Sequence, residues 1–125
     1  MQGVAVDERR QRAMEPEDLS RFFLERANAG DVEGLVALYE PGAVLAFPPG
    51  QLSIGSEAIR DAYAKLLAGR PTFSPGDQQP PIRSDTGDLA LTSTRLAGRG
   101  ATAEVARRQP DGSWLWIIDQ PAVLG

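Results

Sequence analysis

The hydrophobic pattern of the chain changes its period once, near residue 70. Before that point apolar residues recur every three or four positions, as they do on one face of an α-helix. After it, short apolar runs alternate with turn sequences, which is typical of β-strands. Helices followed by consecutive strands predict an α+β fold, in which three N-terminal helices pack on one face of a curved, mostly antiparallel sheet.

The first half of the sequence predicts the three helices. Pro16 suits the first turn of the first helix, where its missing N–H needs no partner. "NAGD" at residues 28–31 supplies a glycine that ends this helix and an aspartate that caps the second. Tyr39 closes the apolar stripe of the second helix, and residues 56–69 form the third. Between them, residues 43–47 predict a short strand.

The second half predicts a Pro-rich connection followed by a meander. Its three strands are expected at residues 88–97, 101–109 and 114–120. Gly-Arg-Gly at 98–100 and Pro-Asp-Gly-Ser at 110–113 are compatible with hairpin turns between them.

The length and charge of the chain narrow its class. A chain of 125 residues is long enough for one core, so we expect a flexible arm at 1–14 and a single domain at 15–125. The net charge of -4, with Lys and Arg scattered, argues against a nucleic-acid partner. No apolar run resembles a signal peptide or approaches the ~20 residues of a membrane span. We therefore expect a cytoplasmic protein that does not bind membranes.

Cysteine and histidine are both absent, which restricts the chemistry that the chain can perform. Disulfides, thiol nucleophiles, Ser-His pairs and the usual zinc ligands are removed. Asp, Glu, Tyr, Lys and Arg remain for proton transfer, and we expect no cofactor. A metal site made of Glu104 and Asp119 is not expected, because two carboxylates without a third ligand bind metals poorly.

Three segments carry a resemblance to a known superfamily. "NAGDVEGLVALYEPGAVLAFPPG", "GSEAIRDAYAKL" and "RRQPDGSWLWIIDQP" occur in the order found in nuclear transport factor 2-like proteins, which the chain resembles over roughly residues 17 to 121. This superfamily includes ketosteroid isomerases and polyketide cyclases. The resemblance implies a cone-shaped α+β fold with an apolar pocket between sheet and helices, and a dimer formed through the outer face of the sheet.

The isomerase-type catalytic positions match only in part. Phe47 occupies the position of the general base, and Phe23 occupies that of the main oxyanion donor. The second oxyanion donor falls near Glu104, and the supporting tyrosine falls on Tyr63. A phenyl ring cannot accept a proton. The resemblance therefore implies the fold without steroid-type isomerisation.

The register of the last hairpin decides where the carboxylate of Asp119 points. A four-residue loop pairs Gln109 with Trp114 and places Asp119 opposite Glu104. A three-residue loop places Asp119 opposite Ala103, away from that second acid. The resemblance places both acids in the pocket and so favours the first register.

On that register we expect Asp119 and Glu104 to be the candidate catalytic residues, with Thr94 opposite Glu104 on the neighbouring strand. The side chains expected to bind a ligand are Phe23, Tyr39, Phe47, Tyr63, Thr92, Thr94, Leu115 and Ile117. Plainer alternatives stay open. Asp119 can be a turn acceptor, Glu104 can form a surface ion pair, and the aromatic side chains can be ordinary core.

Period two along the last strand predicts an interaction surface. If Leu115 and Ile117 face the pocket, Trp114, Trp116 and Ile118 face outward. A row so apolar predicts a homodimer packed sheet to sheet.

Burial and the like charge of Glu104 are expected to raise the pKa of Asp119, whereas an ion pair with Arg108 would lower it. With a raised pKa, Asp119→Asn should be neutral or stabilising at pH 7 and should weaken ligand binding.

Three functions remain compatible with the sequence. The first is binding of a small, largely apolar molecule in the pocket. The second is a carboxylate-dependent isomerase, cyclase, dehydratase or hydrolase that uses Asp119 or Glu104 as acid or base. The third is a non-catalytic dimeric scaffold or accessory subunit. A cavity of ~300 Å³ or more would favour the first two over the third.

Overall fold

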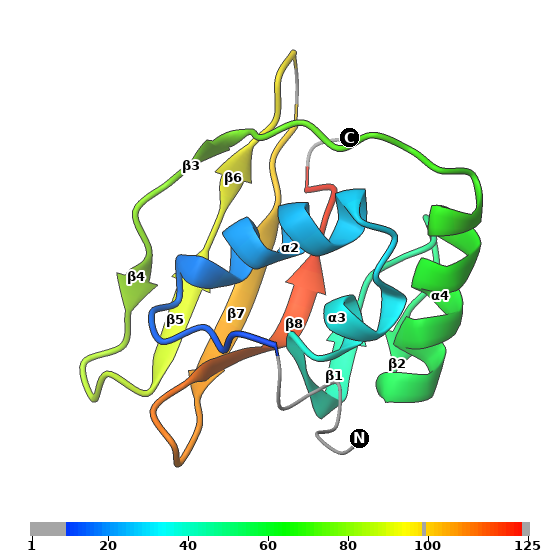
Figure 1. The fold of residues 1–125 in the computed structure, drawn as a ribbon. Helices are drawn as coiled ribbons and strands as arrows, with labels where there is room; N and C mark the ends of the chain where they lie inside the picture. Colours follow the sequence, from blue (N-terminus) through cyan, green and yellow to red (C-terminus); the bar gives the residue numbers. More distant parts are fainter. Residues whose placement is uncertain (1–9, 99, 124–125) are drawn as a thin grey trace.

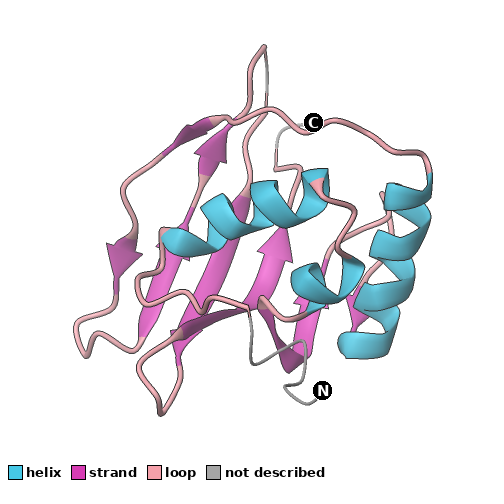
Figure 2. Ribbon diagram, viewed as in Figure 1, coloured by secondary structure: helices cyan, strands magenta, loops and turns pink. Residues whose placement is uncertain are grey.

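The computed structural model describes residues 10–98 and 100–123. Within them, helices α2 (Asp18–Asn28), α3 (Val32–Val36) and α4 (Ser56–Ala68) lie on one face of a curved sheet (Figures 1 and 2). The strands are β1 (Tyr39–Leu45), β2 (Ser53–Ile54), β3 (Asp77–Gln78), β4 (Ile82–Arg83), β5 (Leu89–Thr92), β6 (Thr94–Arg95), β7 (Ala103–Arg108) and β8 (Trp114–Gln120). The predicted α+β fold class is therefore confirmed.

The main sheet has the strand order β2-β1-β8-β7-β5-β4. Its pairs are antiparallel except β1 with β8, which run parallel. A separate two-stranded sheet joins β3 to β6. The core lies between the helices and the inner face of the main sheet, where Leu19, Leu35 and Ile59 from the three helices are fully buried.

The end of α2 and the start of α3 follow from the caps that the sequence predicts, whereas α2 begins at Asp18, so Pro16 precedes the helix instead of lying in its first turn. Gly30 adopts a positive φ of 71° after α2, a conformation that glycine reaches without steric cost. Asp31 caps α3, because its carboxylate accepts the N–H of Gly34 at 3.0 Å. The predicted position of Tyr39 in the second helix is wrong. Tyr39 does not extend that helix, which ends at Val36, and instead begins β1, paired with Trp116 of β8.

The Pro-rich connection is more ordered than the sequence predicts. Residues 71–78, here called the strap, run from the end of α4 across the top of the molecule to β3 (Figure 1). Asn28 holds the strap through two hydrogen bonds to the backbone of Phe73, of 2.7 and 3.0 Å. Gln78 donates to the carbonyl of Glu17 at 2.9 Å. The strand predicted at 88–97 divides at Ser93, because its second part pairs with the strap rather than with β4.

A β-bulge in β8 decides which side chains face the helices. Glu104 pairs with Asp119 and Val105 with Ile118, but Ala106 pairs with Trp116, which leaves Ile117 without a partner. Both hairpin registers considered above therefore occur, one at each end of β8. The favoured pairing of Glu104 with Asp119 is confirmed. The predicted pairing of Gln109 with Trp114 is wrong, because Arg108 pairs with Trp114 and the loop has three residues.

Because of the bulge, the side chains of β8 between the turn and the bulge point to the opposite face of the sheet from the one predicted. Trp114 and Trp116 are 2% and 3% exposed, so the prediction that both indoles face outward is wrong. The extra residue restarts the alternation of the strand, so Trp114, Trp116 and Asp119 share the inner face.

The outer face of the sheet keeps a smaller apolar row. Leu91, Val105 and Ile118 lie side by side on three adjacent strands, and Leu91 and Ile118 are exposed. The homodimer stays a prediction, with this row in place of the two indoles as its surface.

Part of the predicted arm belongs to the domain. The carbonyl of Ala13, which is buried, accepts the N–H of Trp114 at 2.8 Å. Arg10 pairs with Asp31 at 2.7 Å. Residues 10–14 therefore lie against the last hairpin and α3, and the rest of the arm is outside the described residues. In the described part of the chain, no helix is long and apolar enough to cross a membrane.

Candidate ligand-binding cavity

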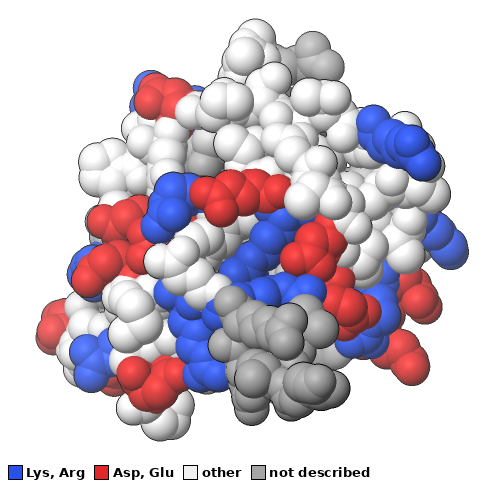
Figure 3. All heavy atoms as spheres, in the orientation of Figure 1, with Lys and Arg blue, Asp and Glu red and all other residues white. Residues whose placement is uncertain are grey.

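A cavity of about 400 Å³ lies between α2, the strap and the inner face of the sheet. Its walls are mainly apolar and include the rings of Phe23, Phe73 and Trp116. Phe23 packs against Phe73 and Trp116 with ring centroids 5.9 and 6.4 Å apart. The volume lies within the range of small-molecule sites. Residues 71–76 of the strap carry no charge, and the surface above α2 in Figure 3 is correspondingly uncharged.

Half of the residues predicted from the sequence line this cavity. They are Phe23, Tyr63, Thr94, Glu104 and Asp119. The others do not line it: Tyr39, Phe47, Thr92, Leu115 and Ile117.

Each of the five exceptions has a physical reason. Tyr39 and Thr92 are buried one layer behind the wall, where they hydrogen-bond to the two acids. Phe47 follows β1 and packs half-buried against the core. The β-bulge removes Leu115 and Ile117 from the cavity face.

The hairpin between β6 and β7 explains the positions of the two threonines. Thr92, not Thr94, lies opposite Glu104. The hairpin closes with Leu96 opposite Gly100, whereas the predicted loop at 98–100 closes with Ala97 opposite Ala101. The loop therefore lies one residue earlier, the partner of each residue shifts by two, and each side chain keeps its face of the sheet. Thr94 therefore still lines the cavity.

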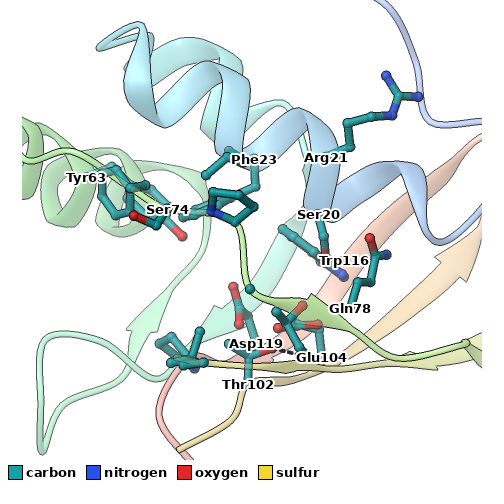
Figure 4. Close-up of a pocket in the computed structure, with 17 residues that line it drawn as sticks. Ser20, Arg21, Phe23, Tyr63, Ser74, Gln78, Thr102, Glu104, Trp116 and Asp119 are labelled. Carbon is teal, nitrogen blue, oxygen red and sulfur yellow. Dashed lines mark hydrogen bonds between the residues drawn. The ribbon is translucent and has the colours of Figure 1, made fainter. Parts of the chain in front are cut away.

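Asp119 lies on the cavity floor and is held from behind by a tyrosine pair. It is 5% exposed, and its Oδ2 accepts a hydrogen bond of 2.5 Å from the hydroxyl of Tyr39. The Tyr39 oxygen is 2.6 Å from the hydroxyl of Tyr63, which lines the cavity from α4. Figure 4 shows Asp119 and Glu104 together on the sheet, with Phe23 and Tyr63 projecting from the helices.

The surroundings raise the pKa of Asp119 to about 7. Burial is the largest cause, because it disfavours the charged form, and the negative charge of Glu104 acts in the same direction. The hydrogen bond from Tyr39 opposes both. Among the described residues, no Arg or Lys forms an ion pair with Asp119, and Arg108 is exposed.

Glu104 has its own polar support. Thr92 donates to its Oε1 at 2.5 Å, and the indole Nε1 of Trp116 donates to Thr92 at 3.3 Å. Burial raises the pKa of Glu104, while hydrogen bonds from Thr102 and Thr92 act against the shift. Glu104 is 5% exposed, so a surface ion pair does not describe it.

The one cation on the cavity wall is engaged elsewhere, as far as the described residues show. Arg21 lines the cavity but pairs with Asp18 at 3.1 Å, and it points away from the acids in Figure 4. Within residues 10–98 and 100–123, no group of three acidic, His or Cys side chains could hold a metal ion. The site therefore combines two buried acids, one tyrosine hydroxyl and apolar walls.

The strap and Trp116 are parts of this wall that the sequence did not predict. The strap becomes a wall only through its long-range hydrogen bonds to α2, which leave no periodic signal. Trp116 was assigned to the opposite face because the bulge was not anticipated.

Comparison with known proteins identifies the family. The sequence profile of the SnoaL-like domain matches residues 19–119, which include both acids. The chain belongs to the SnoaL-like domain family. This SnoaL-like chain thereby also belongs to the nuclear transport factor 2-like superfamily that its sequence resembles. No curated protein sequence matches it closely enough to count as a relative.

Solved structures share the fold of this SnoaL-like chain. A ketosteroid isomerase-like protein from Erwinia carotovora atroseptica is 18% identical, with a TM-score of 0.64 over 82% of this chain and 88% of its own. A proposed dehydratase of the NTF2-like family from Streptomyces avermitilis is 19% identical, with a TM-score of 0.66 over 87% and 94%. A proposed calcium/calmodulin-dependent protein kinase type II association domain from Thiobacillus denitrificans is 17% identical, with a TM-score of 0.74 over 93% and 100%. Such different descriptions on one architecture mean that the likeness shows the fold alone.

Proposed function

We propose that this SnoaL-like protein binds a small, largely apolar molecule in the cavity, and that Asp119 donates a hydrogen bond to a carbonyl oxygen of that molecule. The proposal is supported by a carboxyl that is 5% exposed on the floor of a mainly apolar cavity, where burial raises its pKa to about 7. A neutral carboxylic acid can donate one hydrogen bond, whereas a carboxylate only accepts. An apolar cavity with one such donor selects an apolar ligand and fixes its orientation.

A matched pair of probes tests this function. 2-Acetylnaphthalene carries a carbonyl acceptor, and 2-ethylnaphthalene has a similar shape without one. We expect the acetyl compound to bind about tenfold or more tightly at pH 5.5 than at pH 8.5, because Asp119 loses its donor as it ionises. Fluorescence titration at both pH values measures the two affinities.

The ethyl compound and one variant are the controls. The affinity for 2-ethylnaphthalene should not depend on pH. Asp119→Asn keeps an N–H donor that does not titrate, so it should bind the acetyl compound with the same affinity at both pH values, weaker than that of the wild-type protein at pH 5.5. An affinity of the wild-type protein for 2-acetylnaphthalene that is equal at pH 5.5 and 8.5 would contradict the proposal.

A second candidate function is proton transfer to and from the bound molecule. It is favoured by the pKa of about 7, since a group near this value can both accept and release a proton at neutral pH. In D₂O near pH 7, Asp119 as a carboxylate would take a proton from the methyl group of 2-acetylnaphthalene and return a deuteron to the same carbon. Loss of the methyl proton NMR signal, absent in Asp119→Asn, would establish catalysis. Persistence of that signal with bound probe would restrict the protein to binding.

A further inference from the structure

We propose that Tyr39, which does not line the cavity, is a positioning residue that holds the proton of Asp119 on the oxygen facing the ligand and makes Tyr63 a hydrogen-bond acceptor. The role of Tyr39 in orienting a ligand rests on the proposed function, but the main test of Tyr39 needs no ligand. Tyr39 is buried between β8 and α4, with its ring 5.5 Å from that of Trp116 and 6.2 Å from that of Tyr63.

The single hydroxyl proton of Tyr39 determines the direction of its two hydrogen bonds. A tyrosine hydroxyl donates one hydrogen bond and accepts others. Tyr39 donates to Oδ2 of Asp119 at 2.5 Å, so the 2.6 Å contact with Tyr63 is donated by Tyr63. The chain of donation therefore runs from Tyr63 through Tyr39 to Asp119.

This direction determines what the two ends present to a ligand. Oδ2 of Asp119 already accepts from Tyr39, so a proton taken up by Asp119 resides on Oδ1, to which no described residue donates. Tyr63 directs its O–H at the oxygen of Tyr39, so toward the cavity it presents only lone pairs. A ligand consequently meets a donor at Asp119 and an acceptor at Tyr63.

Loss of the Tyr39 hydroxyl would change both ends together. In Tyr39→Phe, either oxygen of Asp119 could carry the proton, and Tyr63 would be free to turn its O–H into the cavity. The ionised form of Asp119 would also lose its only donor among the described residues, while Glu104 on β7 and Tyr63 on α4 would remain its titratable neighbours. Arg21 on α2 stays paired with Asp18.

The test is a ¹³C NMR titration of the Asp119 carboxyl in the protein without ligand. We expect Tyr39→Phe to move the midpoint upward by about one pH unit, because a hydrogen bond to a charged group is lost. Tyr63→Phe is the matched control. It removes a hydroxyl from the same chain but leaves the bond from Tyr39 to Asp119, so its midpoint should equal that of the wild-type protein.

A second variant covers the case in which Tyr39→Phe does not fold. 3-Fluorotyrosine at position 39 keeps the ring and makes the hydroxyl a stronger donor, so the midpoint should move downward. Unchanged midpoints in the folded position-39 variants would overturn the proposal, since a purely structural Tyr39 would alter stability without altering the titration. A different result would contradict the proposed function: an affinity of the wild-type protein for 2-acetylnaphthalene that does not depend on pH.

Discussion

Asp119→Asn is expected to raise the free energy of unfolding by about 2 to 4 kcal/mol at pH 8 and to leave it nearly unchanged at pH 4. The folded protein holds the pKa of Asp119 at about 7, against an ordinary value of 3.8. Between these two values the folded state binds more protons than the unfolded state, so stability falls as the pH rises and is lowest above the folded pKa. The amide cannot ionise, and its oxygen can still accept the hydrogen bond of Tyr39.

Urea denaturation of both proteins at pH 4 and pH 8 measures this difference. Asp111→Asn is the control of opposite sign. Its exposed carboxylate accepts from Ser113 and Arg12, and these contacts lower the pKa of Asp111 to about 2. That variant should be less stable than wild type at pH 8 rather than more stable. Destabilisation of Asp119→Asn at pH 8 would mean that Asp119 is a structural carboxylate.

Trp116→Ala is expected to lower the free energy of unfolding by about 3 to 5 kcal/mol, a value typical of a large buried ring. The indole of Trp116 is buried, packs against Phe23 and Tyr39, and donates a hydrogen bond to Thr92. Truncation removes these contacts and leaves the hydroxyl of Thr92 with one partner fewer. It also opens the wall of the cavity, so probe affinity should fall as well.

Ile118→Ala on the same strand is the matched control for the bulge. Ile118 is 51% exposed on the outer face, so its truncation should cost less than about 1 kcal/mol in the monomer. An uninterrupted strand would put Ile118 and Trp116 on the same face. Equal losses of stability in the two variants, measured by urea denaturation at one protein concentration, would therefore contradict the bulge.

Local signals in the sequence were sufficient for the fold. The glycine and aspartate of "NAGD" act through their own backbone geometry and hydrogen bonds, so the end of α2 and the start of α3 could be predicted from neighbouring residues. The pairing of Glu104 with Asp119 was also predicted, because the superfamily resemblance places both acids in the pocket. The four-residue loop predicted with it is not formed: a three-residue loop and the β-bulge give the same pairing.

The cavity walls were harder to predict, because they depend on a β-bulge and on long-range pairing, which produce no periodic pattern in the sequence. One unpaired residue, Ile117, reverses the facing of Trp114 and Trp116, and no side-chain pattern distinguishes a bulged strand from a regular one. Tyr39 fits a helical stripe as well as a strand, and only its parallel pairing with Trp116 decides between them. β3 has two residues, too few for an alternation to be read.

The buried acid also explains why an apolar strand carries a carboxylate. Asp119 continues the inner face of β8 beyond Trp116, at the point where the helices leave a cavity above the sheet. A charged group there would be costly, but a carboxyl that is neutral over part of the physiological range can remain buried and still donate a hydrogen bond. Burial raises the pKa of Asp119 most, the charge of Glu104 raises it further, and the hydrogen bond from Tyr39 lowers it, so the value near 7 depends on all three.

The pKa of Asp119 in the wild-type protein is the most direct test of this account. A ¹³C NMR titration with labelled aspartate, assigned by comparison with Asp119→Asn, follows the carboxyl from pH 3 to pH 9. A midpoint near pH 7 is expected, with the carboxyl protonated throughout the lower part of the range. A midpoint below about 4.5, within the ordinary range of aspartate, would show a permanently charged carboxylate and would contradict the proposed donor in the cavity.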